Sequence, residues 1–192
     1  ASVAADLVAH FEERNKAPAE RHNSLLEAPT MFQVATLVGD LLRETIRTRE
    51  QTGLNAETTF NATLIVGGQI KGMEPRLFMI YPEGNFIEAS DDTPFFQIGE
   101  TKYGRPILVR GFQSDMSFES AVKLLMVPFD STMAANLSVA LPLDMLLLPR
   151  DQFEPLQKRR IAEDDPYYRS VSDKWSDALR SAFHSLPDYT IE

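Results

Sequence analysis

Residues 60–104 form the stretch that most constrains how this chain can fold. Short runs of β-branched and aromatic residues alternate there with glycine, proline, asparagine and aspartate. This alternation is typical of an antiparallel meander, because the apolar runs suit a pleated sheet and the other residues suit turns. A turn at Pro82-Glu83-Gly84-Asn85 is expected to close a hairpin. The predicted strands cover residues 59–66, 76–81, 86–89 and 95–98.

Two helices are predicted before the meander. Apolar residues recur at helical spacing over residues 2–15, with charged residues on the opposite side. A second helix follows Thr30, which stands three residues before Gln33 in the spacing of a capping box. Gly53 is expected to end this second helix. We expect the two helices to pack as a pair over one sheet.

Further helices and strands are predicted after the meander. A short helix over 100–110 precedes a longer one that begins at Ser117, in which Pro128 is expected to cause a kink or a break. Asp165 and Pro166 supply a cap and a first-turn proline for a last helix. Its apolar stripe is expected to pack on the protein's own sheet or on a neighbouring subunit, and consists of Tyr167, Val171, Trp175, Leu179 and Phe183. The predicted strands of this part are an apolar one over 138–148, covered on both faces, and another over 153–161.

Length, composition and charge exclude several classes of protein. The 192 residues suit one domain, and 43% hydrophobic residues suffice for its core. No stretch approaches the roughly 20 apolar residues of a membrane span, and the absence of cysteine suits the cytoplasm. A formal net charge of -9 argues against nucleic-acid binding. The basic run Lys158-Arg159-Arg160 is followed by acidic residues and is interpreted as a solvated loop or strand edge.

Several motifs that resemble known sites have simpler interpretations. His10, His22 and His184 have no partner at ligand spacing, so we predict no structural metal and no cofactor. Residues 129–132 place two hydroxyls beside a carboxylate, but no nucleophile elbow or suitable histidine accompanies them, which favours a helix surface. Gly67-Gly68 and Gly72 lack the Lys-Ser/Thr ending of a phosphate loop and are interpreted as turn residues.

Three long strings in and after the meander resemble one family. FNATLIVGGQIKG, RLFMIYPEGNFIEAS and TPFFQIGETKYGRPIL closely resemble Anbu, a bacterial proteasome-type peptidase family related to the HslV protease and to proteasome β-subunits. The resemblance extends from Ser2 to Leu148, and more loosely to the C-terminus. It implies an α+β fold of the N-terminal-nucleophile hydrolases, with two antiparallel sheets between helix layers in an αββα sandwich. It also implies assembly of identical subunits into rings or spirals.

The same resemblance implies a threonine-type peptidase that acts on peptides or unfolded proteins. In such enzymes the first residue is the nucleophile and its own α-amino group is the base. The opening string ASVAADLVAHF resembles the family's first helix instead of its first strand. We therefore expect a single domain over residues 1–192 that lacks its first, catalytic strands and is inactive alone. The alternative is a non-catalytic scaffold subunit that assembles with copies of itself.

Auxiliary active-site residues are implied by the resemblance alone. Glu100 stands where proteasome β-subunits offer a serine hydroxyl close to the nucleophile, and its carboxylate is expected to hold the terminal ammonium or share its proton. The alternative is that Glu100 caps the helix that it precedes. Asn136 and Ser138 stand near positions where the proteasome has a supporting Asp and Ser. Since Asn does not ionise, a hydrogen-bonding role is expected for it.

Overall fold

The structure is a computed structural model that describes residues 24–51 and 61–191, together with Ala9 and Ala17. The chain divides into two compact units, Ala1–Ile98 and Gly99–Glu192, and each is described by itself. The helix predicted over 2–15 and the helix end predicted at Gly53 lie outside the described residues. The expectation that all 192 residues form one domain stays a prediction.

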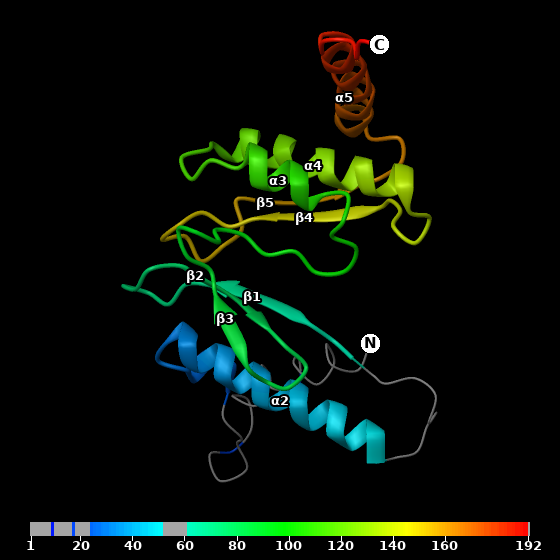
Figure 1. Cartoon of the computed structure of the whole chain (residues 1–192). Helices are drawn as coiled ribbons and strands as arrows, with labels where there is room; N and C mark the ends of the chain where they lie inside the picture. The colour runs from blue at the N-terminus through cyan, green and yellow to red at the C-terminus, as the bar shows by residue number, and fades with distance from the viewer. Residues whose placement is uncertain (1–8, 10–16, 18–23, 52–60, 192) are drawn as a thin grey trace. The chain divides into compact units, whose positions relative to one another are not determined.

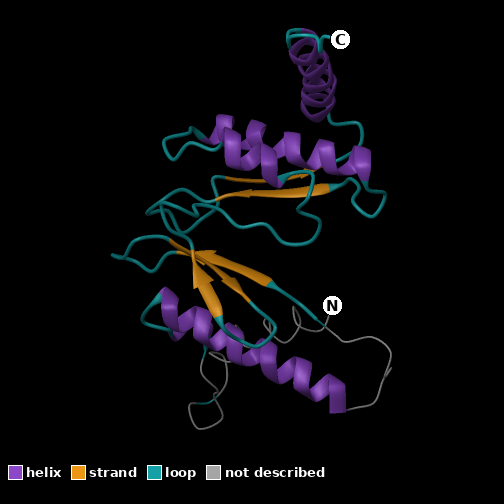
Figure 2. Ribbon diagram, viewed as in Figure 1, coloured by secondary structure: helices purple, strands orange, loops and turns teal. Residues whose placement is uncertain are grey.

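The first unit consists of a helix packed on an antiparallel sheet. Figure 2 shows α2 lying along one face of the three strands. The strands are joined in the order β1-β2-β3, and β2 is the central strand, with Ile80 opposite both Leu64 and Phe86. The elements of this unit are η3 (Leu25–Glu27), α2 (Met31–Gln51), β1 (Leu64–Gly68), β2 (Arg76–Ile80) and β3 (Phe86–Glu88).

The core of this unit joins α2 to β2. Phe78 and Ile80 of β2 are fully buried, as is Leu42 of α2. Burying each of these side chains contributes about 1.5–3 kcal/mol. The ring of Phe78 meets that of Phe86 edge-on, with ring centroids 5.5 Å apart. The other buried members of the core are Leu25, Met31, Ala35 and Val38.

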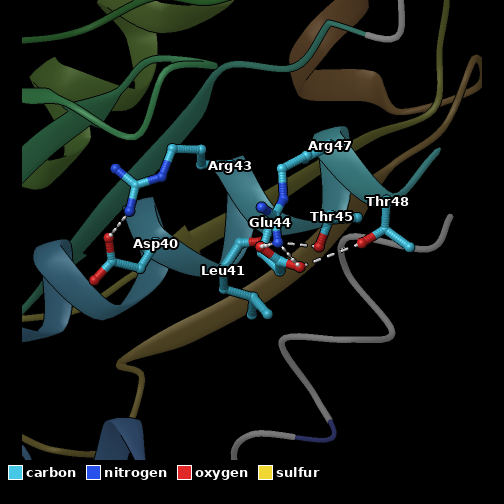
Figure 3. Close-up of polar contacts among 7 residues, drawn as sticks. All are labelled: Asp40, Leu41, Arg43, Glu44, Thr45, Arg47 and Thr48. Atoms are coloured by element: carbon cyan, nitrogen blue, oxygen red, sulfur yellow. Dashed lines mark hydrogen bonds and ion pairs between the residues drawn. The ribbon is translucent and has the colours of Figure 1, made fainter. Parts of the chain in front are cut away.

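Local chemistry explains where α2 begins and how its outer side is stabilised. The predicted cap is confirmed, because Thr30 Oγ1 accepts a hydrogen bond of 3.2 Å from the Gln33 amide. Figure 3 shows the exposed side of the helix, where Arg43 pairs with Asp40 and Arg47 with Glu44. Such exposed pairs contribute only a few tenths of a kcal/mol each. The helix is therefore held mainly by its apolar face.

Two glycines let α2 approach the hairpin backbone closely. A Cβ atom on Gly39 of α2 would lie less than 3.0 Å from the carbonyl oxygen of Gly84. Gly84 itself has φ +86° in the turn between β2 and β3, a conformation that glycine adopts without strain. This close contact joins the middle of the helix to the predicted turn Pro82–Asn85, which is confirmed.

The second unit places helices on a two-stranded antiparallel sheet. In Figure 1, α3 and α4 run over one side of β4 and β5. A buried cluster of Met126, Ile161 and Tyr168 joins α4, β5 and α5. The elements are α3 (Arg105–Gly111), α4 (Phe118–Ala135), β4 (Leu143–Leu147), β5 (Gln157–Ile161) and α5 (Pro166–His184).

The helix start predicted at Ser117 and the cap predicted at Asp165 are both confirmed. Ser117 accepts a hydrogen bond from the Ser120 amide at the start of α4. Asp165 accepts from the amides of Tyr167 and Tyr168 at the start of α5 and also pairs with Arg159. The amide of Tyr168, burial and the Arg159 guanidinium act on the pKa of Asp165, and their net effect lowers it. The ionised form of this cap is therefore favoured.

Several predictions about strands are wrong. Gly67-Gly68 does not end β1 but belongs to it, opposite Leu77 and Arg76. Residues 95–98 are not a strand in the described structure. Within the predicted strand over 138–148, only residues 143–147 form a strand, β4. Leu146 of β4 is 57% exposed, so this unit does not cover both faces of the strand. A second strand at 153–161 is confirmed as β5, shorter by four residues at its start.

Two predictions about helices also differ from the structure. The short helix begins only at Arg105. The break predicted as one alternative at Pro128 does not occur, because α4 continues through it, and the other alternative, a kink, stays a prediction. Pro128 removes one backbone hydrogen bond, but it is buried with Met126 and Val127, and their packing compensates. Along α5, Val171 packs on the core cluster, whereas Leu179 and Phe183 are 50% and 71% exposed. Packing of this outer part of the stripe stays a prediction.

The contact between Gly39 and Gly84 makes a test of the first unit. Alanine normally favours a helix by about 1 kcal/mol over glycine, yet Gly39→Ala should lower the free energy of unfolding by about 1–3 kcal/mol, because its methyl meets backbone. The matched control is Gly111→Ala, whose methyl meets only the flexible end of Leu124, at 2.6 Å. Chemical denaturation of both variants measures the difference. Equal or greater stability of Gly39→Ala would contradict the close approach.

Candidate functional site

The three residues expected at the active site lie together in the second unit. The Asn136 side-chain amide donates a hydrogen bond from Nδ2 to Glu100 Oε2 at 3.1 Å. On its other side, Asn136 Oδ1 accepts from the backbone amide of Ser138 at 2.9 Å and from its hydroxyl at 2.8 Å. We call these residues the Glu100–Asn136–Ser138 network.

Two chain segments position this network. Asn136 is the C-cap of α4, and its backbone amide donates to the carbonyl of Thr132 at 2.8 Å. The chain then turns, since the amide of Val139 donates to the carbonyl of Asn136 at 3.2 Å. Glu100 follows Gly99, whose φ of +81° suits glycine. The network therefore connects the end of α4 to the segment that leads into α3.

Glu100 is not the cap of α3. The N-cap of that helix is Gly104, which makes no side-chain capping bond. Instead, Glu100 Oε1 accepts from the backbone amide of Lys102 at 3.1 Å. The Lys102 amide is a member of the site that sequence reasoning missed, and a backbone donor leaves no signal in a residue pattern. The interpretation of Glu100 as a helix cap is therefore wrong.

The directions of the hydrogen bonds define what the network can bind. The orientation of the Asn136 side-chain amide is fixed by its partners. Its oxygen accepts from the amide and the hydroxyl of Ser138, and its nitrogen donates to Glu100. An ionised carboxylate has about four acceptor positions, and the Asn136 and Lys102 groups occupy two of them at Glu100. Glu100 is half-buried. It therefore keeps capacity to accept hydrogen bonds from a cationic donor such as an ammonium.

In residues 129–132, the Asp130 carboxylate and the Thr132 hydroxyl make hydrogen bonds within the second unit. Tyr168 donates from its hydroxyl to Asp130 Oδ1 at 3.2 Å, and Thr132 donates to the carbonyl of Pro128 at 2.7 Å. Burial and the neighbouring Asp130 raise the pKa of Tyr168 above its usual range. Because Thr132 is buried, the interpretation of this stretch as a helix surface is wrong for that residue.

The other candidates from the sequence form no site. His184 is exposed in the last turn of α5, while His10 and His22 lie outside the described residues. Within the described part of the chain, no three His, Asp or Glu side chains gather closely enough for a metal ion. The same residues contain no helix long and apolar enough to cross a membrane. The basic run belongs to β5 and is exposed, with Arg160 bound to Asp144 at 3.0 Å.

The bond between Asn136 and Glu100 makes a pH-dependent test. In Asn136→Asp, two carboxylates would face each other, and their repulsion would raise the pair's pKa values above the unfolded ones of about 3.9 and 4.3. The variant therefore loses stability as the pH rises through these values, because both carboxyl groups ionise. We expect the free energy of unfolding, relative to the parent, to be about 1–2 kcal/mol lower at pH 7.5 than at pH 4.

The control for this prediction is Asn136→Ala, which removes the same hydrogen bonds without adding a charge. Its loss of stability should depend less on pH. Chemical denaturation of the parent and both variants at the two pH values measures the effect. An Asn136→Asp deficit equal at pH 4 and pH 7.5 would mean that the two side chains do not face each other.

Comparison with known proteins assigns the chain to a family. The model of the proteasome subunit family matches residues 32–138. No significant match is found among curated proteins. Among solved structures, an Anbu mutant from Hyphomicrobium sp. strain MC1 is 46% identical, with a TM-score of 0.86, over 98% of this chain and 75% of that one.

Two further solved structures agree with this assignment. Anbu from Yersinia bercovieri, described as an ancestral beta-subunit, is 40% identical, with a TM-score of 0.87, over 99% of this chain and 78% of that one. Anbu from Pseudomonas aeruginosa, solved as a helical assembly, is 37% identical, with a TM-score of 0.87, over 98% of this chain and 77% of that one. The predicted α+β fold of the proteasome type, with antiparallel sheets and helices, is confirmed. The chain belongs to the proteasome subunit family and, within it, to the Anbu proteins.

Proposed function

We propose that this chain is the larger part of a threonine-type peptidase subunit that hydrolyses peptide bonds in the cytoplasm. Two findings support the proposal. The chain belongs to the Anbu proteins, and Glu100, Asn136 and Ser138, which the resemblance implies as auxiliary residues, are joined by hydrogen bonds. The network is the observation that carries the proposal. It leaves the Glu100 carboxylate with capacity to bind a cation, next to the hydrogen-bonded side chains of Asn136 and Ser138.

The proposed reaction gives Glu100 an electrostatic role. An N-terminal hydroxyl attacks the peptide carbonyl while the terminal amine takes its proton and becomes an ammonium. Glu100 stabilises this ammonium, and Asn136 keeps the carboxylate oriented. Backbone amides hold the oxyanion until it collapses to an ester, when the peptide C–N bond breaks and the ammonium gives its proton to the departing amine. Water then hydrolyses the ester, with the terminal amine again taking the proton, and the hydroxyl is regenerated. We propose that the nucleophile strand lies outside these 192 residues, so that they are inactive alone.

A second candidate function is a scaffold that assembles with copies of itself without catalysis. The helical assembly of the P. aeruginosa Anbu complex favours self-association. The exposed outer part of the α5 stripe, with Leu179 and Phe183, offers apolar surface for such contacts. Assembly and catalysis are compatible, so the two candidates differ only in whether peptide bonds are cleaved. Peptides or unfolded proteins are the proposed substrates, with no role for nucleic acid or membrane.

The nucleophile is tested on the full-length product of the gene. N-terminal sequencing and intact mass identify the first residue of the mature protein, which we expect to be Thr, Ser or Cys. Incubation with a defined peptide mixture, followed by mass spectrometry, detects cleavage. Substitution of that first residue by Ala should abolish cleavage and leave the assembly state unchanged. An assembled protein that cleaves no peptide would favour the scaffold instead.

The role of Glu100 is tested by Glu100→Gln. An amide of the same shape loses the charge that stabilises the ammonium, so kcat should fall about 10- to 100-fold. The free energy of unfolding should fall by only about 1 kcal/mol, because one hydrogen-bond acceptor is replaced. The control is Glu154→Gln, at an exposed carboxylate on the surface. Equal kcat values for the two variants would remove Glu100 from the mechanism.

A further inference from the structure

The chain bends at Gly99, immediately before the carboxylate of the network. Gly99 has φ +81°, in the left-handed region, where a Cβ atom crowds the backbone of every residue except glycine. The residue is exposed, and a Cβ atom built on it would meet nothing within 4 Å. Packing therefore does not require a glycine here. The backbone conformation does.

Hydrogen bonds fix the chain on the other side of Glu100. The carboxylate uses both oxygens, because Oε1 accepts from the Lys102 amide and Oε2 from the Asn136 side chain, each at 3.1 Å. The carbonyl of Thr101 accepts from the amide of the first residue of α3 at 3.0 Å. Glu100 can reach both of its donors only if the chain enters this segment from the right direction. The φ angle of Gly99 sets that direction.

We propose that Gly99 is a positioning residue of the site, whose left-handed backbone conformation holds the Glu100 carboxylate between its two donors. This inference rests on the proposed peptidase function, because it takes Glu100 as the group that stabilises the terminal ammonium. A change of φ at Gly99 turns Glu100 relative to the chain before it. Since hydrogen bonds and charge interactions weaken with distance and misalignment, a displaced carboxylate stabilises the ammonium less.

Gly72 provides a matched control in the first unit. It has φ +82°, and it is also exposed, with nothing within 4 Å of a Cβ atom. It lies in the turn after β1, where the Met73 amide donates to the Ile70 carbonyl at 2.9 Å. Gly99→Ala and Gly72→Ala therefore introduce the same kind of backbone strain, but only Gly99→Ala changes the residue that precedes Glu100.

Kinetics of the full-length protein compare these two variants. For Gly99→Ala, kcat should fall about 5- to 10-fold with KM little changed, because the carboxylate is misplaced when the ammonium forms. Gly72→Ala should keep the parent kcat. Gly99→Asn should recover most of the loss, since asparagine adopts the left-handed conformation more readily than alanine. Equal kcat values for Gly99→Ala and Gly72→Ala would overturn the inference.

A double-mutant cycle tests whether Gly99 acts through Glu100. In the Glu100→Gln protein, Gly99→Ala should lower kcat by less than about twofold, because the charge that it would misplace is already absent. The same loss of kcat in both backgrounds would mean that Gly99 affects the site by another route, and the positioning role would be wrong.

Hydrogen exchange gives a readout that does not need catalysis. Mass spectrometry follows deuterium uptake at the Lys102 amide, whose acceptor is Glu100 Oε1. Uptake should be about tenfold faster in Gly99→Ala and unchanged in Gly72→Ala. Equal uptake in the parent and Gly99→Ala would contradict the inference. Faster uptake in Gly99→Ala, in a protein whose parent form cleaves no peptide, would overturn the proposed peptidase and keep Gly99 as the residue that positions Glu100.

Discussion

The hydrogen bond from Asn136 to Glu100 is the constraint on which the proposed site depends. It connects residues 36 positions apart and joins the end of α4 to the segment before α3. Asn136 fits this position because an amide is both donor and acceptor, and here it serves Glu100 on one side and Ser138 on the other. An aspartate would lack the donor, and a leucine would lack both functions. The polar site thus lies at the end of a helix whose buried residues include Met126, a member of the core.

Close contacts and paired polar groups also hold the helices and strands of each unit together. In the first unit, Gly39 and Gly84 allow the helix and the hairpin turn to touch backbone to backbone. In the second unit, Asp165 caps α5 and binds Arg159 of β5, while Tyr168 reaches Asp130 of α4. Small residues and paired polar groups therefore fix elements that apolar burial alone would leave free to slide.

Local chemistry explains which parts of the fold were predictable. The cap at Thr30, the turn at Pro82–Asn85 and the start at Asp165-Pro166 each depend on a few neighbouring residues, and all three are confirmed. The failures involve contacts made at a distance. Gly67-Gly68 belongs to a strand because β2 pairs with it, and α4 continues through Pro128 because burial compensates for the lost hydrogen bond.

The candidate site was also only partly predictable, because its contacts join distant parts of the chain. No residue pattern pairs Glu100 with Asn136, and only the resemblance to Anbu brought them to attention. The backbone amide of Lys102, which also donates to Glu100, was not predictable from residue type.

The central claim is that Glu100 stabilises the terminal ammonium of the mature protein. The most direct measurement is the pKa of that α-amino group, followed by NMR in the parent and in Glu100→Gln. A nearby carboxylate raises an amine's pKa relative to the same site without the charge. The account predicts a pKa lower by about one unit in the variant. Identical values in both proteins would show that the carboxylate does not act on the amine, and would contradict the account.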